Sequence, residues 1–558
     1  MAGGRIRVNI IMQFKRAVLA TVLSTLVLTG CGGGGGGGGG GASTSTSNTS
    51  APPPATVTPD GSSRTISSSC PFQQNLGAAR GDNLHIDSVR WLQTVEMVSD
   101  APDTRLAGGK AVKVRIDLLA SDNQLAPTRR ELRVYNPADG SCTVIPVDGP
   151  SRVPAARDGD TLNSAFVANI PASLVKPGMT ASLVFDDGSG RSAGEADQTY
   201  RVLVPSVAPA VKEVLRIIPL TLLGSTGYNS SQIAELITRL YPVSEVEVHV
   251  ESPLNITTSL LSSLTLSGGI YSGTVGLMQN LLNTVDDLCA TLNGSQTNPR
   301  TAPKCLALVP DNLIFSASGG GQTTGLAYVG GIAMVARSVA SVDITNVSGP
   351  YDASHWITYN AMTVAHEYGH LLDLDHAACG GATGIDPRLY ADGHLGGVPG
   401  YDATRNVYFA SSHLNAGGQP MFSDVMSYCG KEWVSDRGYL ATMAYRAGSA
   451  DQAAARTTSA DSSGSTSTQW LKIALTPKGW KIRHAGFAPS TLETSKMQLE
   501  VSSDKGVETL SVLSAVISEH HDTAGFGPFY INLGDRHVSS LRLLSDGVEM
   551  TRWGSSDL

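Results

Sequence analysis

Apolar and polar residues alternate in short runs over a long N-terminal stretch of the chain, 70–205. The runs include "AVKVRIDLL" at 111–119, "RELRVYN" at 130–136 and "TASLVFD" at 180–186, and Gly, Pro, Asn and Asp separate them. A period of two is typical of strands that bury one face, and turn residues at short intervals favour antiparallel sheets. We therefore predict an immunoglobulin-like β-sandwich over 70–205.

A different pattern begins near residue 210 and continues to 447. Continuous apolar runs, typical of buried strands, alternate with segments whose apolar positions recur every three or four residues, as in helices. The strands are predicted at 213–223, 244–250, 305–310 and 325–336, and the helices at 230–241, 273–292 and 354–374. This alternation predicts an α/β domain over 210–447 with a largely parallel sheet. The segment 375–420 has no clear period, and we expect a long functional loop there.

The last part of the chain returns to short alternating runs. "WLKIALTPKGWKIRHAGF" at 470–487 has the pattern of a β-hairpin and follows a spacer rich in Ser, Thr and Ala. We predict a small C-terminal β domain over 468–558, whose role, substrate binding or capping of the core, stays open. The predicted fold class is multidomain, which suits a chain of 558 residues at about 100–200 residues per domain.

The first 30 residues have the layout of an export signal. Lys15 and Arg16 precede an apolar run at 17–28 that is too short to span a bilayer comfortably. The following "LTGC", which ends at Cys31, resembles the lipobox of bacterial lipoproteins and implies that Cys31 becomes a lipidated N-terminus. Residues 31–69, rich in Gly, Ser, Thr and Pro, are predicted to be a flexible tether. We expect an exported lipoprotein, anchored to the outer membrane and facing the periplasm or the cell surface; an ordinary secreted protein is the alternative.

Charge and cysteine content narrow the partners and the compartment. The net charge of −8 gives no basic surface that would bind nucleic acid, so we expect no nucleic-acid partner. Separately, we expect the protein to be a monomer. Besides Cys31 the chain has six cysteines, and export favours disulfides between them. Six cysteines allow 15 connectivities. We predict pairing in chain order, because each pair then lies within one predicted domain: Cys70–Cys142, Cys289–Cys305 and Cys379–Cys429.

The clearest candidate for chemistry is "HEYGH" at 366–370, within the predicted helix 354–374. Two histidines four positions apart lie on one face of a helix and can share a metal ion. Zinc binds neutral imidazole nitrogens at about 2.0–2.1 Å and keeps one position open in catalytic sites. We therefore predict His366 and His370 as zinc ligands and Glu367 as the general base that takes a proton from the attacking water.

His376, six residues after His370, is the predicted third ligand. It cannot share the face of a continuing helix, so the helix must end near Leu372 or Asp373 and the chain must turn. Position 373 is glycine in the pattern HExxHxxGxxH. Asp is enriched among non-glycine residues with positive φ. We predict either positive φ at Asp373 or contact of its carboxylate with the third ligand, a role that Asp375 could also fill.

A second motif, "SDVMSYCGKEWVSD" at 423–436, follows 50 residues after His376. HExxHxxxxxH followed by a methionine-containing turn resembles the metzincin clan of zinc endopeptidases. The resemblance implies that Met426 lies in a tight turn beneath the zinc and that Tyr428 approaches the metal and stabilises the oxyanion. Within the clan, the chain looks most like secreted bacterial metzincins related to dictomallein and to mucin-cleaving enzymes. These also place a β domain before the catalytic domain, and 163–186 is similar to a segment of it.

These motifs together predict a zinc-dependent metalloendopeptidase that hydrolyses proteins or glycoproteins. Two alternatives stay open: a non-catalytic adhesin or glycan-binding lipoprotein on a peptidase scaffold, and a zinc amidase that acts on cell-wall peptide. Glu367 favours an enzyme, because a degenerate scaffold need not keep its base. By analogy with the clan, 325–336 is expected to be an edge strand that binds substrate in extended form, with Gly330 and Gly331 allowing close approach. An ordinary core strand is the alternative.

Overall fold

The structure is a computed structural model, and it describes most of the chain after residue 83. The predicted signal peptide at 1–30, Cys31 and Cys70 lie outside the described residues. Within the predicted tether, β1 (Thr56–Val57) pairs antiparallel with β2 (Ser63–Arg64). No helix among the described residues is long and apolar enough to cross a membrane. The described residues are 56–57, 63–64, 84–121, 125–186, 200–222, 230–256, 264–267, 270–294, 296, 298–310, 313–316, 322–337, 359–415, 418–429, 431–448, 470–476, 479–485, 488, 492–516, 528–534 and 536–554.

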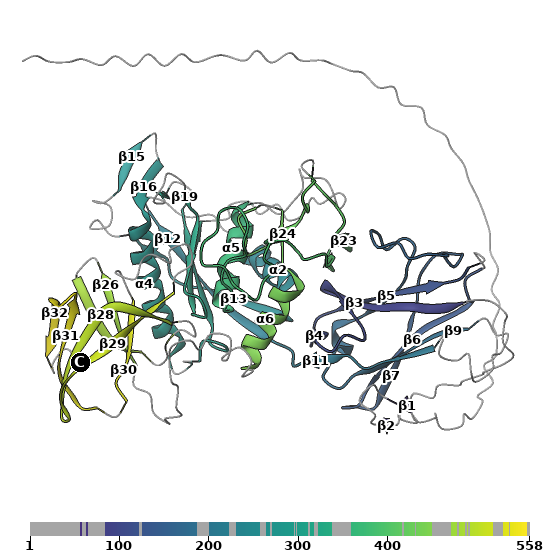
Figure 1. Cartoon of the computed structure of the whole chain (residues 1–558), viewed down its shortest axis with the longest axis horizontal. Coiled ribbons are helices and arrows are strands. Elements are labelled where there is room, and N and C mark those ends of the chain that lie inside the picture. The colour runs from purple at the N-terminus through teal and green to yellow at the C-terminus, as the bar shows by residue number, and fades with distance from the viewer. Residues whose placement is uncertain are drawn as a thin grey trace, which may run out of the picture. The chain divides into compact units, whose positions relative to one another are not determined.

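Two antiparallel sheets form the N-terminal β region (Figure 1), with strand orders β23-β22-β3-β5-β8 and β10-β9-β6-β7, where β22 is Gly400–Asp402 and β23 is Val407–Phe409. Apolar side chains of both sheets belong to one core, in which the rings of Phe166 and Phe185 lie 5.3 Å apart. Two packed sheets agree with the alternating pattern, while an immunoglobulin-like topology stays a prediction. The elements of this region are β3 (His85–Val98), β4 (Arg105–Ala107), β5 (Val112–Leu119), β6 (Arg129–Asn136), β7 (Ser141–Pro146), β8 (Phe166–Ile170), the 3-10 helix η1 (Ala172–Leu174), β9 (Thr180–Asp186), β10 (Tyr200–Leu203) and β11 (Ser206–Ala208), which pairs with β4.

A hairpin from the predicted long loop completes the first of these sheets. β22 (Gly400–Asp402) pairs antiparallel with β23 (Val407–Phe409) and, on its other side, with β3. Arg115 of β5 is fully buried beneath this hairpin and donates a hydrogen bond of 2.9 Å to the hydroxyl of Tyr408. Strands of three residues are too short to show an alternating pattern, so the sequence did not indicate them.

A mainly parallel sheet forms the central region, with the order β13-β12-β17-β21-β20. Every neighbouring pair in it is parallel except β20 and β21. α5 packs against β20 and β21, and α4 against β17 and β21. The elements are β12 (Lys212–Thr221), α2 (Ser230–Leu240), β13 (Glu245–Val250), β14 (Leu254–Asn255), α4 (Val275–Asn293), β17 (Lys304–Val309), β20 (Gly325–Ala327), β21 (Ala333–Arg337) and α5 (Tyr359–Leu371). All of them except β14, β20 and β21 lie close to their predicted positions.

The prediction of one continuous strand over 325–336 is wrong, because this segment is a hairpin. β20 and β21 pair antiparallel, and residues 328–332 form the turn between them. Gly330 has a φ of 65°, and its N–H donates a 2.7 Å hydrogen bond to the carbonyl of His370. Two adjacent glycines are a turn signal, and here they form the turn. β20 alone keeps the predicted position at the edge of the described sheet.

Shorter elements surround this sheet. α6 (Asp436–Ala447) begins after the N-cap Ser435 and ends at Gly448 with a φ of 67°. The sequence did not reveal α6, because its buried face carries Tyr, Thr and Gly in place of an aliphatic stripe. The remaining strands are β24 (Ser423–Asp424) and β25 (Glu432–Trp433), which pair in parallel, and β15 (Thr265–Ser267), β16 (Ile270–Thr274), β18 (Leu313–Ser316) and β19 (Gln322–Thr323), which form a sheet in that order.

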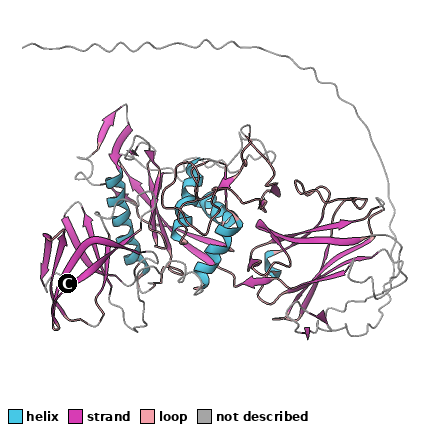
Figure 2. Ribbon diagram, in the orientation of Figure 1, coloured by secondary structure: helices cyan, strands magenta, loops and turns pink. Residues whose placement is uncertain are grey.

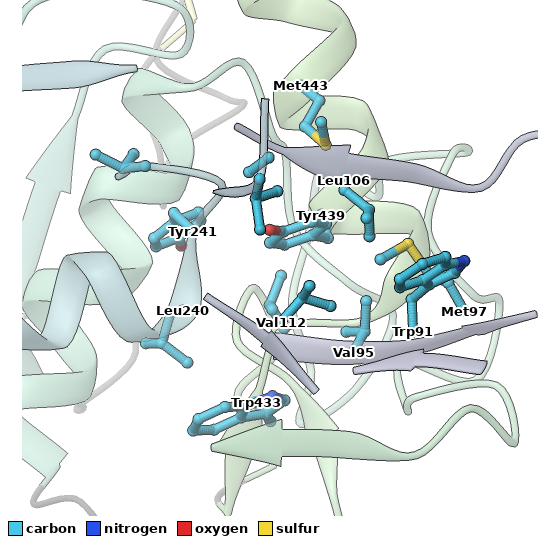
Figure 3. Packing of buried hydrophobic residues seen from close by; sticks show 14 of the residues in the cluster. Trp91, Val95, Met97, Leu106, Val112, Leu240, Tyr241, Trp433, Tyr439 and Met443 are labelled. Atoms are coloured by element: carbon cyan, nitrogen blue, oxygen red, sulfur yellow. The ribbon is translucent and has the colours of Figure 1, made fainter. Parts of the chain in front are cut away.

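One hydrophobic core joins the N-terminal sheets to the central helices (Figure 3). Trp91 and Val95 of β3 belong to it, together with Tyr241, which follows α2, and Tyr439 of α6. The indole of Trp433 is fully buried and donates a 2.8 Å hydrogen bond to the carbonyl of Thr94 on β3. Residues 51–558 accordingly form one compact unit, while the predicted domain boundaries stay predictions.

The C-terminal region is an antiparallel sheet of seven strands, and Figure 2 shows no helix among its described residues. β26 and β27 form the predicted hairpin. The ammonium of Lys472 on β26 is buried and lies 2.6 Å from the carboxylate of Asp286 on α4, so an ion pair connects this region to the central one. The strand order is β27 (Gly479–Ala485), β26 (Trp470–Thr476), β30 (Phe529–Asn532), β29 (Gly506–Ala515), β28 (Leu492–Ser503), β31 (Val538–Ser545) and β32 (Val548–Gly554).

Two of the three predicted disulfides are confirmed. Cys289 of α4 is bonded to Cys305 of β17, and Cys379 is bonded to Cys429. Cys142 is also disulfide-bonded. Its predicted partner lies outside the described residues.

Candidate metal centre

α5 presents His366, Glu367 and His370, and all three side chains are buried. Tyr241 anchors the helix, because its hydroxyl donates a 2.7 Å hydrogen bond to the carbonyl of Ala365. Gly369 faces the methionine of the later motif, and a β-carbon at this position would collide with its sulfur. Glycine inside a helix costs about 0.5–1 kcal/mol relative to alanine, and here it allows close packing.

The chain turns directly after α5, as the spacing of the histidines requires. Asp373 has a φ of 72°, which confirms the predicted positive φ. Its N–H donates a 2.9 Å hydrogen bond to the carbonyl of His370, and its carboxylate lies 3.3 Å from the guanidinium of Arg388. Arg388 also pairs with Asp386 at 2.6 Å. The carboxylate of Asp373 therefore stabilises the turn through Arg388, a residue that the sequence did not single out.

The turn brings His376 to the two helical histidines. The candidate ligand nitrogens of His366, His370 and His376 all lie within 4.8 Å of one another. The Nε2 atoms of His366 and His370 are 3.1 Å apart. Each Nδ1 lies within hydrogen-bond distance of a backbone carbonyl. Nδ1 of His366 is 2.8 Å from the carbonyl of Val425, and Nδ1 of His370 is 2.7 Å from that of Leu374. Nδ1 of His376 is 2.6 Å from the carbonyl of Thr383. No carboxylate is needed to orient the third histidine.

This hydrogen bonding decides which nitrogens face inward with a lone pair. A carbonyl accepts, so each Nδ1 carries a proton, and in the neutral ring Nε2 is then left with a lone pair. Burial, together with the neighbouring His376, lowers the pKa of His366 to about 3, so this imidazole is neutral near pH 7. The three imidazoles thus converge through their Nε2 atoms.

The three histidines fit a metal ion. A metal bonded to two nitrogens at about 2.0–2.1 Å with tetrahedral angles holds them roughly 3.3 Å apart, close to the 3.1 Å between His366 and His370. Lone pairs that face each other at this distance repel, and a shared cation removes the repulsion. Three protein ligands also leave one position of a tetrahedral site for water or substrate. The buried group could therefore bind a metal ion.

The second motif forms a tight turn beside the histidines. Met426 is fully buried, and its carbonyl accepts a 2.9 Å hydrogen bond from the N–H of Ala377, next to His376. The carboxylate of Asp424 accepts from the N–H of Met426 at 2.8 Å and from that of Ser435 at 3.2 Å. Burial raises the pKa of Asp424 to about 6, although these two N–H groups act in the opposite direction. Sequence reasoning missed Asp424, whose place two residues before the methionine is typical of an Asx turn.

Tyr428 lies on the same side of the site and is 40% exposed. Its hydroxyl is 2.8 Å from Nε2 of His376, and its ring is stacked near the ring of His366 at 5.6 Å. Its N–H donates a 3.2 Å hydrogen bond to the carbonyl of Cys379. The Cys379–Cys429 disulfide joins the same two segments covalently. The segment that carries the third histidine and the turn that carries Tyr428 are therefore fastened together.

A small open cavity of about 60 Å³ lies beside Glu367. Thr324, which directly precedes β20, lines it, and Gly325 of β20 is so close to Glu367 that a β-carbon there would collide with the carboxylate. Of the residues that line it, the sequence singled out His366, Glu367 and Tyr428. The described residues that line the cavity are Thr324, Met362, Thr363, His366, Glu367, Val425, Ser427, Tyr428 and Glu432.

The chain was compared with models of protein families and with curated proteins, and neither comparison produced a match.

Proposed function

We propose that the protein is a zinc-dependent metalloendopeptidase of the metzincin clan. The observation that carries this proposal is the convergence of the three imidazoles of His366, His370 and His376, with Glu367 in the wall of the adjoining cavity. Imidazole ligands suit zinc, and three histidines with an open position are typical of catalytic zinc. The Met426 turn supports the clan, because its methionine is buried and its carbonyl accepts a hydrogen bond from Ala377, next to His376.

In this proposal the three histidines hold the metal through Nε2, and the carbonyls at their Nδ1 atoms fix the ring orientations. Bound zinc supplies Lewis acidity, which polarises the scissile carbonyl and makes a water more acidic. The disulfides suit an oxidising compartment, which supports export. We propose an exported lipoprotein anchored through Cys31 that acts as a monomer on proteins or glycoproteins.

Glu367 is the residue proposed to move protons. Its carboxylate takes a proton from the attacking water and later gives it to the nitrogen of the leaving amine. The side chain is 1% exposed, and Gly325 leaves the space that the carboxylate occupies. A carboxylate confined in this way is ready for proton transfer without reorganisation.

Tyr428 is proposed to stabilise the substrate oxygen as it gains negative charge. Its hydroxyl can donate one hydrogen bond, and it now lies 2.8 Å from Nε2 of His376. It must release this contact when the histidine binds a metal. The 40% exposed side chain can then turn towards substrate in the cavity.

A substrate panel tests the proposal. The full chain would be incubated with folded proteins, O-glycosylated proteins and cell-wall peptides, with and without a chelator, and the products mapped by mass spectrometry. Cleavage of internal peptide bonds that stops with chelator and returns with added zinc is expected. Cleavage of cell-wall peptide alone indicates the amidase, and binding without any cleavage indicates the adhesin; either result contradicts the proposal.

A further inference from the structure

The cavity beside Glu367 contains a second buried carboxylate that the proposed mechanism does not use. Glu432 lines this cavity and is 8% exposed. The cavity is also lined by three residues with hydroxyl groups, Thr324, Thr363 and Ser427. The hydroxyls of Thr324 and Thr363 lie 3.3 Å apart. No Lys or Arg occurs among the described residues that line the cavity. Two carboxylates and several oxygen acceptors thus face a small space.

The backbone around Glu432 is held firmly. β25 pairs in parallel with β24, and the N–H of Val425 donates a 2.7 Å hydrogen bond to the carbonyl of Trp433. Trp433 is fully buried, and its indole is hydrogen-bonded to the N-terminal sheet. Successive side chains of a strand point to opposite faces. Because Trp433 points into the core, its neighbour Glu432 points to the other side, towards the cavity.

We propose that Glu432 makes this cavity selective for a cationic substrate side chain, lysine or arginine, at a residue flanking the cleaved bond. The inference rests on the proposed function and names its substrate class. A buried carboxylate forms strong, charge-assisted hydrogen bonds with an ammonium or guanidinium group. The three hydroxyls can accept its remaining N–H groups, while Met362 and Val425 contact the methylene stem. A volume of about 60 Å³ suits a small head group.

Matched peptides test the selectivity. In one series, each residue flanking the cleaved bond is in turn lysine or norleucine, which keeps the four side-chain carbons and removes the charge. The wild-type protein is expected to cleave the lysine peptide with a kcat/KM about 10- to 100-fold higher. Glu432→Gln keeps the shape of the side chain, and it should bring this ratio close to one. A wild-type ratio near one, or an unchanged ratio in Glu432→Gln, overturns the inference.

A binding measurement separates this inference from the proposed function. Glu367→Gln removes the general base and one carboxylate of the cavity, which leaves Glu432 as the remaining carboxylate among the described residues that line it. Calorimetry should show that Glu367→Gln binds the lysine peptide at least about 10-fold more tightly than the norleucine peptide. The Glu367→Gln/Glu432→Gln double variant should bind both equally.

The outcomes are distinguishable. If the wild-type protein cleaves peptides without preference for lysine, the inference fails and the proposed function stands. If it cleaves no peptide but Glu367→Gln binds lysine selectively, the proposed function fails and Glu432 marks a cation-binding cavity. If there is neither cleavage nor selective binding, both are overturned.

Discussion

The hydroxyl of Tyr428 lies 2.8 Å from Nε2 of His376, although the two residues are 52 positions apart in the chain. The contact joins the segment after α5 to the turn of Met426. A backbone hydrogen bond from Tyr428 to Cys379 and the Cys379–Cys429 disulfide hold the same two segments together. The positions of Tyr428 and of His376, the proposed third ligand, are therefore coupled by short, local connections.

Replacing Tyr428 with phenylalanine should lower kcat by about 10²-fold, because one donor to the developing oxyanion is lost. The ring remains, and the side chain is partly exposed, so folding and zinc content should not change. Steady-state kinetics and metal analysis of the same preparation check this. A normal kcat in Tyr428→Phe would remove the residue from the mechanism.

Two substitutions of Asp373 isolate the strain of its backbone. Both alanine and glycine lose the carboxylate contact with Arg388 and keep the hydrogen bond from Arg388 to the carbonyl of residue 373, but only alanine keeps a β-carbon at a φ of 72°. We expect Asp373→Ala to be less stable than Asp373→Gly by about 1–2 kcal/mol. Thermal unfolding of the two variants measures the difference. Equal midpoints would show that the turn tolerates a β-carbon without cost.

Removal of the Cys379–Cys429 disulfide should weaken both stability and zinc affinity. The bond spans 50 residues, and the chain-entropy model gives a loss of about 4 kcal/mol. The matched control is removal of Cys289–Cys305, which spans 16 residues and should cost about 3 kcal/mol. Only the first variant should bind zinc more weakly, because only that bond fastens His376. Zinc titration of both double-serine variants decides the question, and equal affinities contradict the prediction.

Asp424 should impose a pH dependence on stability. Burial raises its folded pKa to about 6, above the unfolded value of about 3.9, so the folded protein binds more protons between these limits. The contribution of protonated Asp424 to the free energy of unfolding is fully present below about pH 4 and is lost as the pH rises through 6. This loss is at most about 1.4 kcal/mol per pH unit. Asp424→Asn cannot titrate. Its stability deficit relative to wild type should therefore shrink from pH 4 to pH 6, measured by thermal unfolding; a deficit that grows would contradict the assigned pKa.

Short-range patterns were sufficient for the helical part of the site. The four-residue spacing of His366 and His370 follows from helix geometry alone, and the distance to His376 required a turn at Asp373, which the structure contains. The parallel strands and the C-terminal hairpin were also visible as apolar runs. Two disulfides followed from pairing the cysteines in chain order.

Long-range contacts explain what the sequence could not show. Gly369 is required by the sulfur of Met426, which lies far along the chain, and neither residue alone reveals the other. The hairpin over 325–336 was mistaken for one strand because both of its arms are apolar and buried. Glu432 is next to a core tryptophan in the sequence, and only the pairing of β25 with β24 places it on the cavity wall.

The most direct test of the zinc peptidase is a comparison of wild type with Glu367→Gln, in which zinc content and the rate of peptide hydrolysis are measured on the same samples. Gln keeps the size of the side chain and leaves the three histidines unchanged. We predict one zinc per chain in both proteins and a rate at least about 10²–10⁴-fold lower in Glu367→Gln. Full activity in the variant, or in wild-type protein freed of metal, would contradict the account.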